Sequence, residues 1–148
     1  MKKVIFLDVD GVLNSNDSID RAPQGMVWFV DPVIVARFNK IFDVLKDVDV
    51  VLSSSWRYAV KMRRIDFNQI MRDAGYTGPE ITEITPDGEE ERGLEIQQWL
   101  DRHPSVEKFV IIDDNDDMLH LLPHLIETSF DDNGLKDSHV DKIIGILK

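Results

Sequence analysis

The sequence contains no cysteine, no long apolar run, and fewer basic than acidic residues. Without cysteine, disulfides, a thiolate nucleophile and cysteine-ligated zinc are all excluded. No apolar stretch approaches the roughly 20 residues of a membrane-spanning helix. None near the N-terminus is long enough for a secretory signal, so we expect a cytoplasmic protein without membrane contact. The net charge of -11 argues against broad electrostatic attraction to nucleic acid.

The residues that are present indicate a single α/β domain. A chain of 148 residues with 43% hydrophobic content is able to bury one sizeable core. Short β-like runs alternate with amphipathic helical runs, which predicts a three-layer, Rossmann-like fold with a parallel sheet of about five strands between helices. We expect one domain over residues 1–148 without a large cap, because residues 15–30 and 58–86 are too short for a separate lid. Residues 15–30 are expected to form only a small flap.

The expected elements follow from periodicity and from capping residues. Asp31-Pro32 and Asp66 are predicted to begin helices, and Gly75 to end the second of them. The expected strands cover residues 4–7, 48–52, 81–85, 109–112 and 125–126. Further helices are expected over residues 93–102 and at the end of the chain, where Val140, Ile143, Ile144 and Leu147 form the buried stripe.

The first predicted strand leads directly into Asp8-Val9-Asp10-Gly11. Residues that alternate in an extended chain point to the same side, so both carboxylates leave the strand together, and Gly11 allows the backbone to turn. Two carboxylates at the end of a buried strand are expensive to desolvate unless a cation or phosphate chemistry uses them. A calcium loop is the alternative, but Val12-Leu13 stands where further oxygen ligands would be needed.

Polar residues also follow two later strands. The second strand runs into Ser53-Ser54-Ser55, and the fourth into Asp113-Asp114. A hydroxyl at a strand end can donate a hydrogen bond to a phosphoryl oxygen without adding charge. The alternative is that these serines cap the next helix, which suits Ser55 and also Ser54.

Together these strand ends resemble the small phosphatases of the haloacid dehalogenase-like (HAD) superfamily. The stretches DVDGVLN, VVLSSSWR and VIIDD, with the late Gly134-Leu135, are similar to compact members related to domains found with RNA-repair enzymes. The resemblance spans the whole chain. It implies a HAD-like fold and hydrolysis of phosphomonoesters, with nucleotides or nucleic-acid ends among the candidate substrates.

The resemblance also implies a role for each matching residue. Asp8 would be the nucleophile that forms an aspartyl-phosphate, and Asp10 the general acid and base, with its backbone carbonyl on the metal. Mg²⁺ suits these oxygen ligands, and Asp113 or Asp114 would complete the site. Ser53 would bind the phosphoryl group, with Ser54 as the alternative.

The chain departs from the family pattern at its third motif, which is usually lysine. Lys108 directly abuts the fourth strand, so Arg92, at the start of the helix over residues 93–102, has the better position to stabilise phosphoryl charge. The alternative is that Arg92 is a surface residue that balances the acids of residues 89–91.

A basic cluster follows the serines. If that segment is helical, Arg57, Lys61 and Arg64 share one face, where they would bind a multiply charged substrate such as a polynucleotide end. The alternative is a solvated helix face. Trp28 and Phe29 are in turn either a base-stacking lid or, as we favour, a packing anchor.

Two other functional classes stay open at this stage. A receiver-type signalling domain also has an aspartyl-phosphate site, but it would carry its acceptor aspartate on a later strand than Asp8. The other alternative is a non-catalytic magnesium-binding interaction module, which the arginine-for-lysine departure leaves open.

Overall fold

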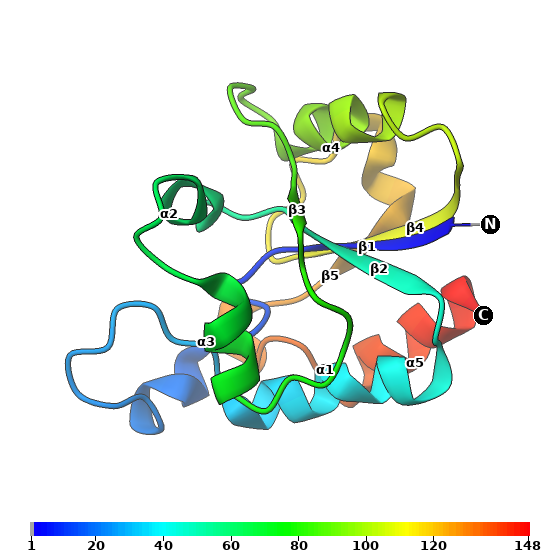
Figure 1. The fold of residues 1–148 in the computed structure, drawn as a ribbon. Helices are drawn as coiled ribbons and strands as arrows, with labels where there is room; N and C mark the ends of the chain where they lie inside the picture. Colours follow the sequence, from blue (N-terminus) through cyan, green and yellow to red (C-terminus); the bar gives the residue numbers. More distant parts are fainter. Residues whose placement is uncertain (1) are drawn as a thin grey trace.

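The computed structural model describes residues 2–148. Its centre is a parallel five-stranded sheet in the order β3-β2-β1-β4-β5 (Figure 1). The strands are β1 Lys2–Leu7, β2 Val48–Leu52, β3 Glu83–Ile84, β4 Val106–Asp113 and β5 Leu125–Glu127. The predicted three-layer α/β fold is confirmed, and residues 2–148 contain no cap domain.

The strand order places a switch point beside β1. The chain runs outward from β1 to β2 and β3, and then crosses to β4 and β5 on the other side. β1 pairs with both β2 and β4. In such sheets ligands bind at the carboxyl ends of the strands where the order reverses, which here is the edge beyond β1 and β4.

Helices cover both faces of the sheet (Figure 1). On one face, α1 (Pro32–Val44), α3 (Phe67–Asp73) and α5 (Asp137–Leu147) pack on a core that includes Ile5 and Leu7 of β1. On the other face, α4 (Arg92–Asp101) and the 3-10 helix η2 (Leu119–His124) pack on a core that includes Val4 and Phe6. Because β1 is buried on both faces, all four of these residues are apolar.

The predicted helix boundaries are confirmed where a cap defines them. The Asp31 carboxylate accepts a hydrogen bond from the backbone N–H of Val33 at the start of α1, with Pro32 in the first turn. The Asp66 carboxylate accepts one from Gln69 N–H at the start of α3. Gly75 follows α3 with a φ of +92°, a left-handed conformation that ends a helix at little cost for glycine.

The structure differs from the prediction at the sheet edge and in the loops. β3 covers only Glu83–Ile84 instead of residues 81–85. At its start, the Asn68 side chain hydrogen-bonds both the N–H and the C=O of Ile81, so this residue does not pair with β2. The three 3-10 helices η1 (Asn16–Asp20), η2 and η3 (Phe130–Asp132) were not expected. Among residues 2–148 there is no helix with the length and apolar content that crossing a membrane requires.

The segment over residues 15–30 consists of η1 followed by turns. The Trp28 ring meets the Trp56 ring edge to face, with centroids 5.1 Å apart. This contact agrees with the packing role favoured for Trp28, although more than a third of its surface remains exposed. The segment stays anchored at its end, where Asp31 N–H donates to Leu13 C=O.

Candidate active site

The carboxyl ends of three neighbouring strands bring the predicted residues together. Asp8 follows β1, Ser53 follows β2, and Asp113 ends β4. Asp8 N–H donates to Ile112 C=O at 3.0 Å, and Ser53 N–H donates to Leu7 C=O at 2.8 Å. These hydrogen bonds continue the sheet pairing, so the backbone under the site is as fixed as the sheet itself.

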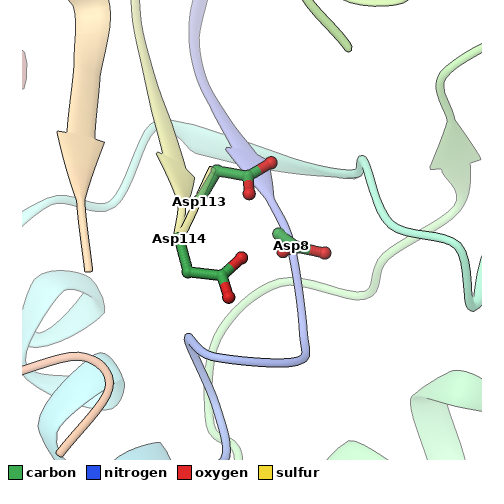
Figure 2. A group of neighbouring side chains, drawn as sticks. All are labelled: Asp8, Asp113 and Asp114. Carbon is green, nitrogen blue, oxygen red and sulfur yellow. The ribbon is translucent and has the colours of Figure 1, made fainter. Parts of the chain in front are cut away.

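Three carboxylates form a cluster at this edge (Figure 2). One oxygen each from Asp8, Asp113 and Asp114 lies within 4.8 Å of the others. Asp8 and Asp113 are buried, whereas Asp114 is exposed. Both members of the predicted pair, Asp113 and Asp114, therefore lie close enough to share a cation with Asp8.

The electrostatics of the cluster favour a bound cation. Burial raises the pKa of Asp8. Burial, and then the negative charge of Asp8, raise the pKa of Asp113 more strongly. A divalent cation that prefers oxygen ligands would offset this repulsion and let both groups ionise.

Gly11 leaves room for the third carboxylate. A Cβ atom at this position would lie 2.2 Å from the Asp114 Oδ2 atom, and Gly11 has a φ of +81°. Any other residue would therefore be strained and would also displace Asp114. The glycine of the Asp-x-Asp-Gly sequence is needed for the geometry of the acidic cluster as well as for the turn.

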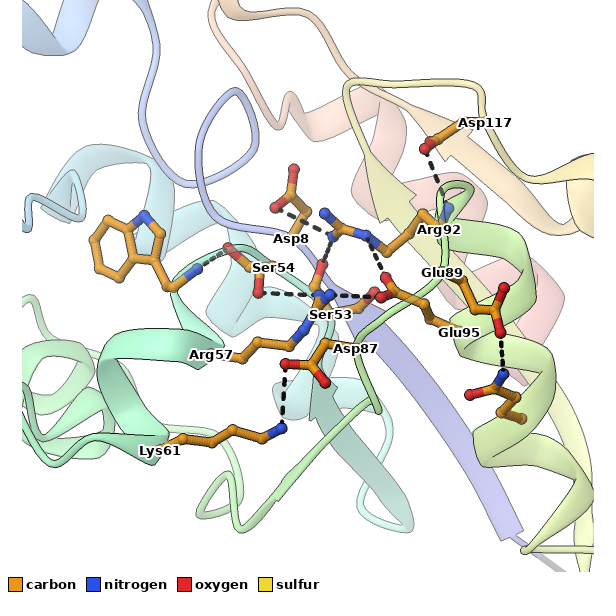
Figure 3. Close-up of polar contacts among 12 residues, drawn as sticks. Asp8, Ser53, Ser54, Arg57, Lys61, Asp87, Glu89, Arg92, Glu95 and Asp117 are labelled. Carbon is orange, nitrogen blue, oxygen red and sulfur yellow. Dashed lines mark hydrogen bonds and ion pairs between the residues drawn. The ribbon is translucent and has the colours of Figure 1, made fainter.

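Arg92 reaches into the site from the first turn of α4 (Figure 3). Its Nη1 atom lies 3.9 Å from Asp8 Oδ1 and 3.8 Å from Asp113 Oδ2. The same nitrogen donates a hydrogen bond to the backbone carbonyl of Ser53. The alternative that Arg92 only balances the surface acids is wrong, because no ion pair joins it to residues 89–91 within the part of the chain that the structure describes.

A buried glutamate that the sequence analysis did not single out orients this arginine. Glu95 Oε1 lies 3.4 Å from Arg92 Nε, and Glu95 Oε2 accepts a 2.8 Å hydrogen bond from Arg57 Nη2. Both Arg57 and Glu95 are buried. The only sequence signal was a charged residue on the inner side of α4, one position before the buried Ile96.

The two predicted serines have different surroundings. The Ser53 hydroxyl is buried and, within residues 2–148, has no hydrogen-bond partner. The Ser54 hydroxyl accepts a 3.1 Å hydrogen bond from Trp56 N–H. Ser53 is therefore the serine whose hydroxyl has no contact of its own among the described residues, whereas Ser54 has the local capping contact of the alternative interpretation.

Asp10 lies outside the acidic cluster. Its carboxylate accepts a 2.9 Å hydrogen bond from Asn14 Nδ2 and a 3.1 Å hydrogen bond from Trp56 Nε1. Asn14 Nδ2 also donates to Phe29 C=O. Asn14 and Trp56, neither of them predicted, thus hold the carboxylate in one orientation, and the metal contact expected through the Asp10 carbonyl remains a prediction.

The predicted basic face on one helix is wrong. α2 covers only Arg57–Lys61, so Arg64 lies beyond its end, and Arg63 adopts a φ of +56°. Arg57 is buried in its ion pair with Glu95, and Lys61 lies 3.4 Å from Asp87 (Figure 3). The short helix cannot present all three side chains on one exposed face, although substrate binding by Lys61 or Arg64 stays a prediction.

Comparison with known proteins identifies the family once this geometry is known. The family model described as "HAD domain in Swiss Army Knife RNA repair proteins" matches residues 4–140. That range includes all of the strand-end residues described above. No curated protein and no solved structure matches the chain.

Proposed function

This chain belongs to the family of HAD domains in Swiss Army Knife RNA repair proteins, and from this premise we propose that it is a magnesium-dependent phosphomonoesterase. One observation carries the proposal. The Asp8 carboxylate stands among two further carboxylates, the Arg92 guanidinium and the Ser53 hydroxyl, which has no hydrogen-bond partner within residues 2–148. A nucleophile, a cation site and two phosphoryl-binding donors thus meet at one strand edge.

The proposed reaction has two displacements. In the first, a carboxylate oxygen of Asp8 attacks phosphorus, the bond from phosphorus to the leaving oxygen breaks, and Asp10 gives its proton to that oxygen. In the second, water attacks the aspartyl-phosphate, Asp10 takes a proton from the water, and the bond from phosphorus to Asp8 breaks. Inorganic phosphate leaves and both carboxyl groups return to their starting state.

The other residues act on the charge of the phosphoryl group. The Arg92 Nη1 atom lies 3.9 Å from Asp8 Oδ1, and Ser53 has a hydroxyl that no protein atom satisfies within residues 2–148. Both suit oxygens that gain negative charge in the transition state. Asp8, Asp113 and Asp114 would hold Mg²⁺, which supplies the positive charge that lets an anionic substrate approach three acids.

The substrate is proposed to be a nucleotide or a polynucleotide end. The family description names RNA repair, and the absence of a cap domain in residues 2–148 leaves the strand edge open to a large substrate. Arg63 and Arg64 line a cavity of about 410 Å³ that includes Leu52, the neighbour of Ser53. The cytoplasmic location expected from the sequence is part of this proposal.

A substrate panel tests the proposal. Asp8→Asn should abolish magnesium-dependent hydrolysis of every phosphomonoester in a panel of free nucleotides and 5′- and 3′-phosphorylated oligonucleotides, because the nucleophilic charge is lost at nearly constant size. Asp141→Asn, an exposed acid on α5, is the matched control. Turnover by Asp8→Asn at the wild-type rate would reject the mechanism. Magnesium binding by the wild type without any turnover would favour the non-catalytic alternative.

The receiver-type alternative loses its basis. Family membership assigns the chain to HAD domains, and Asp8 stands after β1, the first strand in the chain. A receiver-type acceptor would stand on a later strand. The remaining competitor of the proposed phosphatase is therefore a HAD domain that has lost its activity.

A further inference from the structure

A second cavity opens beside Asp10. It has a volume of about 210 Å³ and includes Asp10 and Asn14 in its lining. Pockets that enclose a whole drug-sized ligand measure about 300–1,000 Å³. This cavity is therefore large enough for part of a substrate only.

The walls of the cavity are mostly apolar and come from segments far apart in the sequence. Ile19 belongs to η1, Val27 and Phe29 belong to the flap segment, and Phe130 begins η3. Ile19 is 69% exposed and Val27 is 80% exposed. Exposed apolar side chains that gather around one hollow indicate a binding surface, because scattered ones would not share a cavity.

The charge around this hollow excludes an anionic occupant. No lysine or arginine lines the cavity among residues 2–148, and Asp10 is its charged lining residue. Asp20 and Asp131 follow the wall residues Ile19 and Phe130 in sequence, and the nearby cation Arg21 is already paired with Asp31. A second phosphate or a carboxylate in this position would meet the Asp10 carboxylate, with no lysine or arginine in the described lining to pair with.

Asp10 fixes which part of the substrate faces this cavity. In the proposed reaction, which this inference rests on, Asp10 protonates the leaving oxygen. The group attached to that oxygen must therefore lie on the Asp10 side of the phosphorus. We propose that the hollow formed by Ile19, Val27, Phe29 and Phe130 binds the leaving group, and that it selects esters whose alcohol carries a neutral flat ring, such as the base of a nucleoside.

Three esters of primary alcohols test this specificity, because their leaving oxygens are chemically similar. Benzyl phosphate should have a kcat/KM roughly 10-fold above that of ethyl phosphate, as expected for one apolar group in a pocket. 4-Carboxybenzyl phosphate should fall back toward ethyl phosphate. Equal values for all three esters would overturn the inference and leave the proposed phosphatase function standing.

A matched pair of double variants locates the effect. Ile19→Asn with Val27→Thr should remove the preference for benzyl over ethyl phosphate. Ile146→Asn with Val44→Thr makes the same changes at exposed positions of α5 and α1, and should keep the preference. A preference that survives in the first pair, or disappears in both, places the ring outside this cavity.

A binding measurement separates this inference from the proposed reaction. Should no ester be hydrolysed, the proposed function fails. Calorimetry with benzylphosphonate and ethylphosphonate, in the presence of magnesium, then decides the inference by itself. Tighter binding of benzylphosphonate that the Ile19→Asn, Val27→Thr variant loses would support the hollow, and equal binding of the two phosphonates would reject it.

Discussion

The guanidinium of Arg92 contacts four other residues at once. It donates to Ser53 C=O, lies beside Glu95, and stands 3.9 Å and 3.8 Å from Asp8 and Asp113. A lysine ammonium is a single point charge on a flexible stem, whereas arginine presents five donors in a fixed plane. Arginine stands here in place of the family's usual lysine, and the four residues around it make contacts that need the planar, multi-donor guanidinium.

Two substitutions at Arg92 are expected to show how much of its effect on kcat comes from its positive charge and how much from the planar guanidinium. Arg92→Ala should lower kcat about 10²-fold to 10³-fold, the loss typical for one donor to a transition-state oxygen. Arg92→Lys should lower it by only about 10-fold, because the charge remains and the bidentate fork is lost. Single-turnover kinetics measure both effects, with Arg102→Ala at the other end of α4 as the control. A wild-type rate for Arg92→Ala would remove Arg92 from the reaction.

Trp56 is expected to act through Asp10. Trp56→Phe keeps a buried ring beside Trp28 and Phe67 but removes the Nε1–H donor that lies 3.1 Å from Asp10 Oδ2. With this hydrogen bond lost, we expect kcat for an alkyl phosphate to fall about 10-fold.

Comparing two esters with different leaving groups distinguishes a loss of proton donation by Asp10 from a general loss of activity. Hydrolysis of 4-nitrophenyl phosphate should change much less, because its leaving oxygen needs no proton from Asp10. Trp99→Phe makes the same substitution in the core on the opposite face of the sheet, and should affect neither ester. Equal slowing of both esters by Trp56→Phe would show that Trp56 does not position the acid.

At the scale of elements, the position of Arg92 depends on how closely α4 approaches the segment after β4. Arg92 N–H donates to the Asp117 carboxylate and Gly93 N–H to Asp117 C=O. A Cβ atom on Gly93 would lie 2.2 Å from the backbone oxygen of Met118. The first turn of α4 therefore fits only because residue 93 has no side chain.

Gly93→Ala is expected to destabilise the fold by about 1–3 kcal/mol, the range for forcing an extra methyl group into a packed contact. Urea unfolding measures the change. Gly145→Ala is the matched control, since nothing lies within 4 Å of a Cβ atom there, and alanine in a helix should stabilise it by roughly 0.5–1 kcal/mol. Equal stabilities for both variants would mean that α4 can shift away from Met118 at little cost.

Some features of these elements could be predicted from the sequence and others could not. The helix starts at Asp31 and Asp66, and the strand ends at Asp8, Ser53 and Asp113, were predictable because local capping and burial patterns define them. The Glu95 contact was not predictable, since it joins residues 38 positions apart. The length of α2 was also missed, because spacing shows which residues could share a face but not where a helix ends.

At the scale of the whole molecule, the excess negative charge and the acidic cluster both disfavour the binding of an anionic substrate. The chain carries a net charge of -11, and two of its carboxyls, Asp8 and Asp113, are buried next to each other. Like charges at one buried site oppose folding as well as the binding of an anionic substrate. The proposed active site is therefore expected to lower the stability of the metal-free protein, a common consequence of functional arrangements.

Magnesium binding and one substitution should each relieve the cost of burying Asp8 beside Asp113, and they should do so by different means. Burial and the neighbouring Asp8 raise the pKa of Asp113, so this carboxyl must take up a proton when the metal-free protein folds. Asp113→Asn removes that requirement and should raise the Tm of the metal-free protein by about 2–4 °C, which corresponds to roughly 1 kcal/mol for a chain of this size. Magnesium should raise the Tm of the wild type, because a ligand that binds only the folded state stabilises it. In Asp113→Asn that magnesium-dependent rise should be largely lost, since a ligand of the cluster is gone.

Scanning calorimetry with and without magnesium measures all four values, and Asp141→Asn controls for the change in net charge. A wild-type magnesium response in Asp113→Asn would remove Asp113 from the metal site, and a lower Tm without metal would show that the Asp113 carboxyl stabilises the fold.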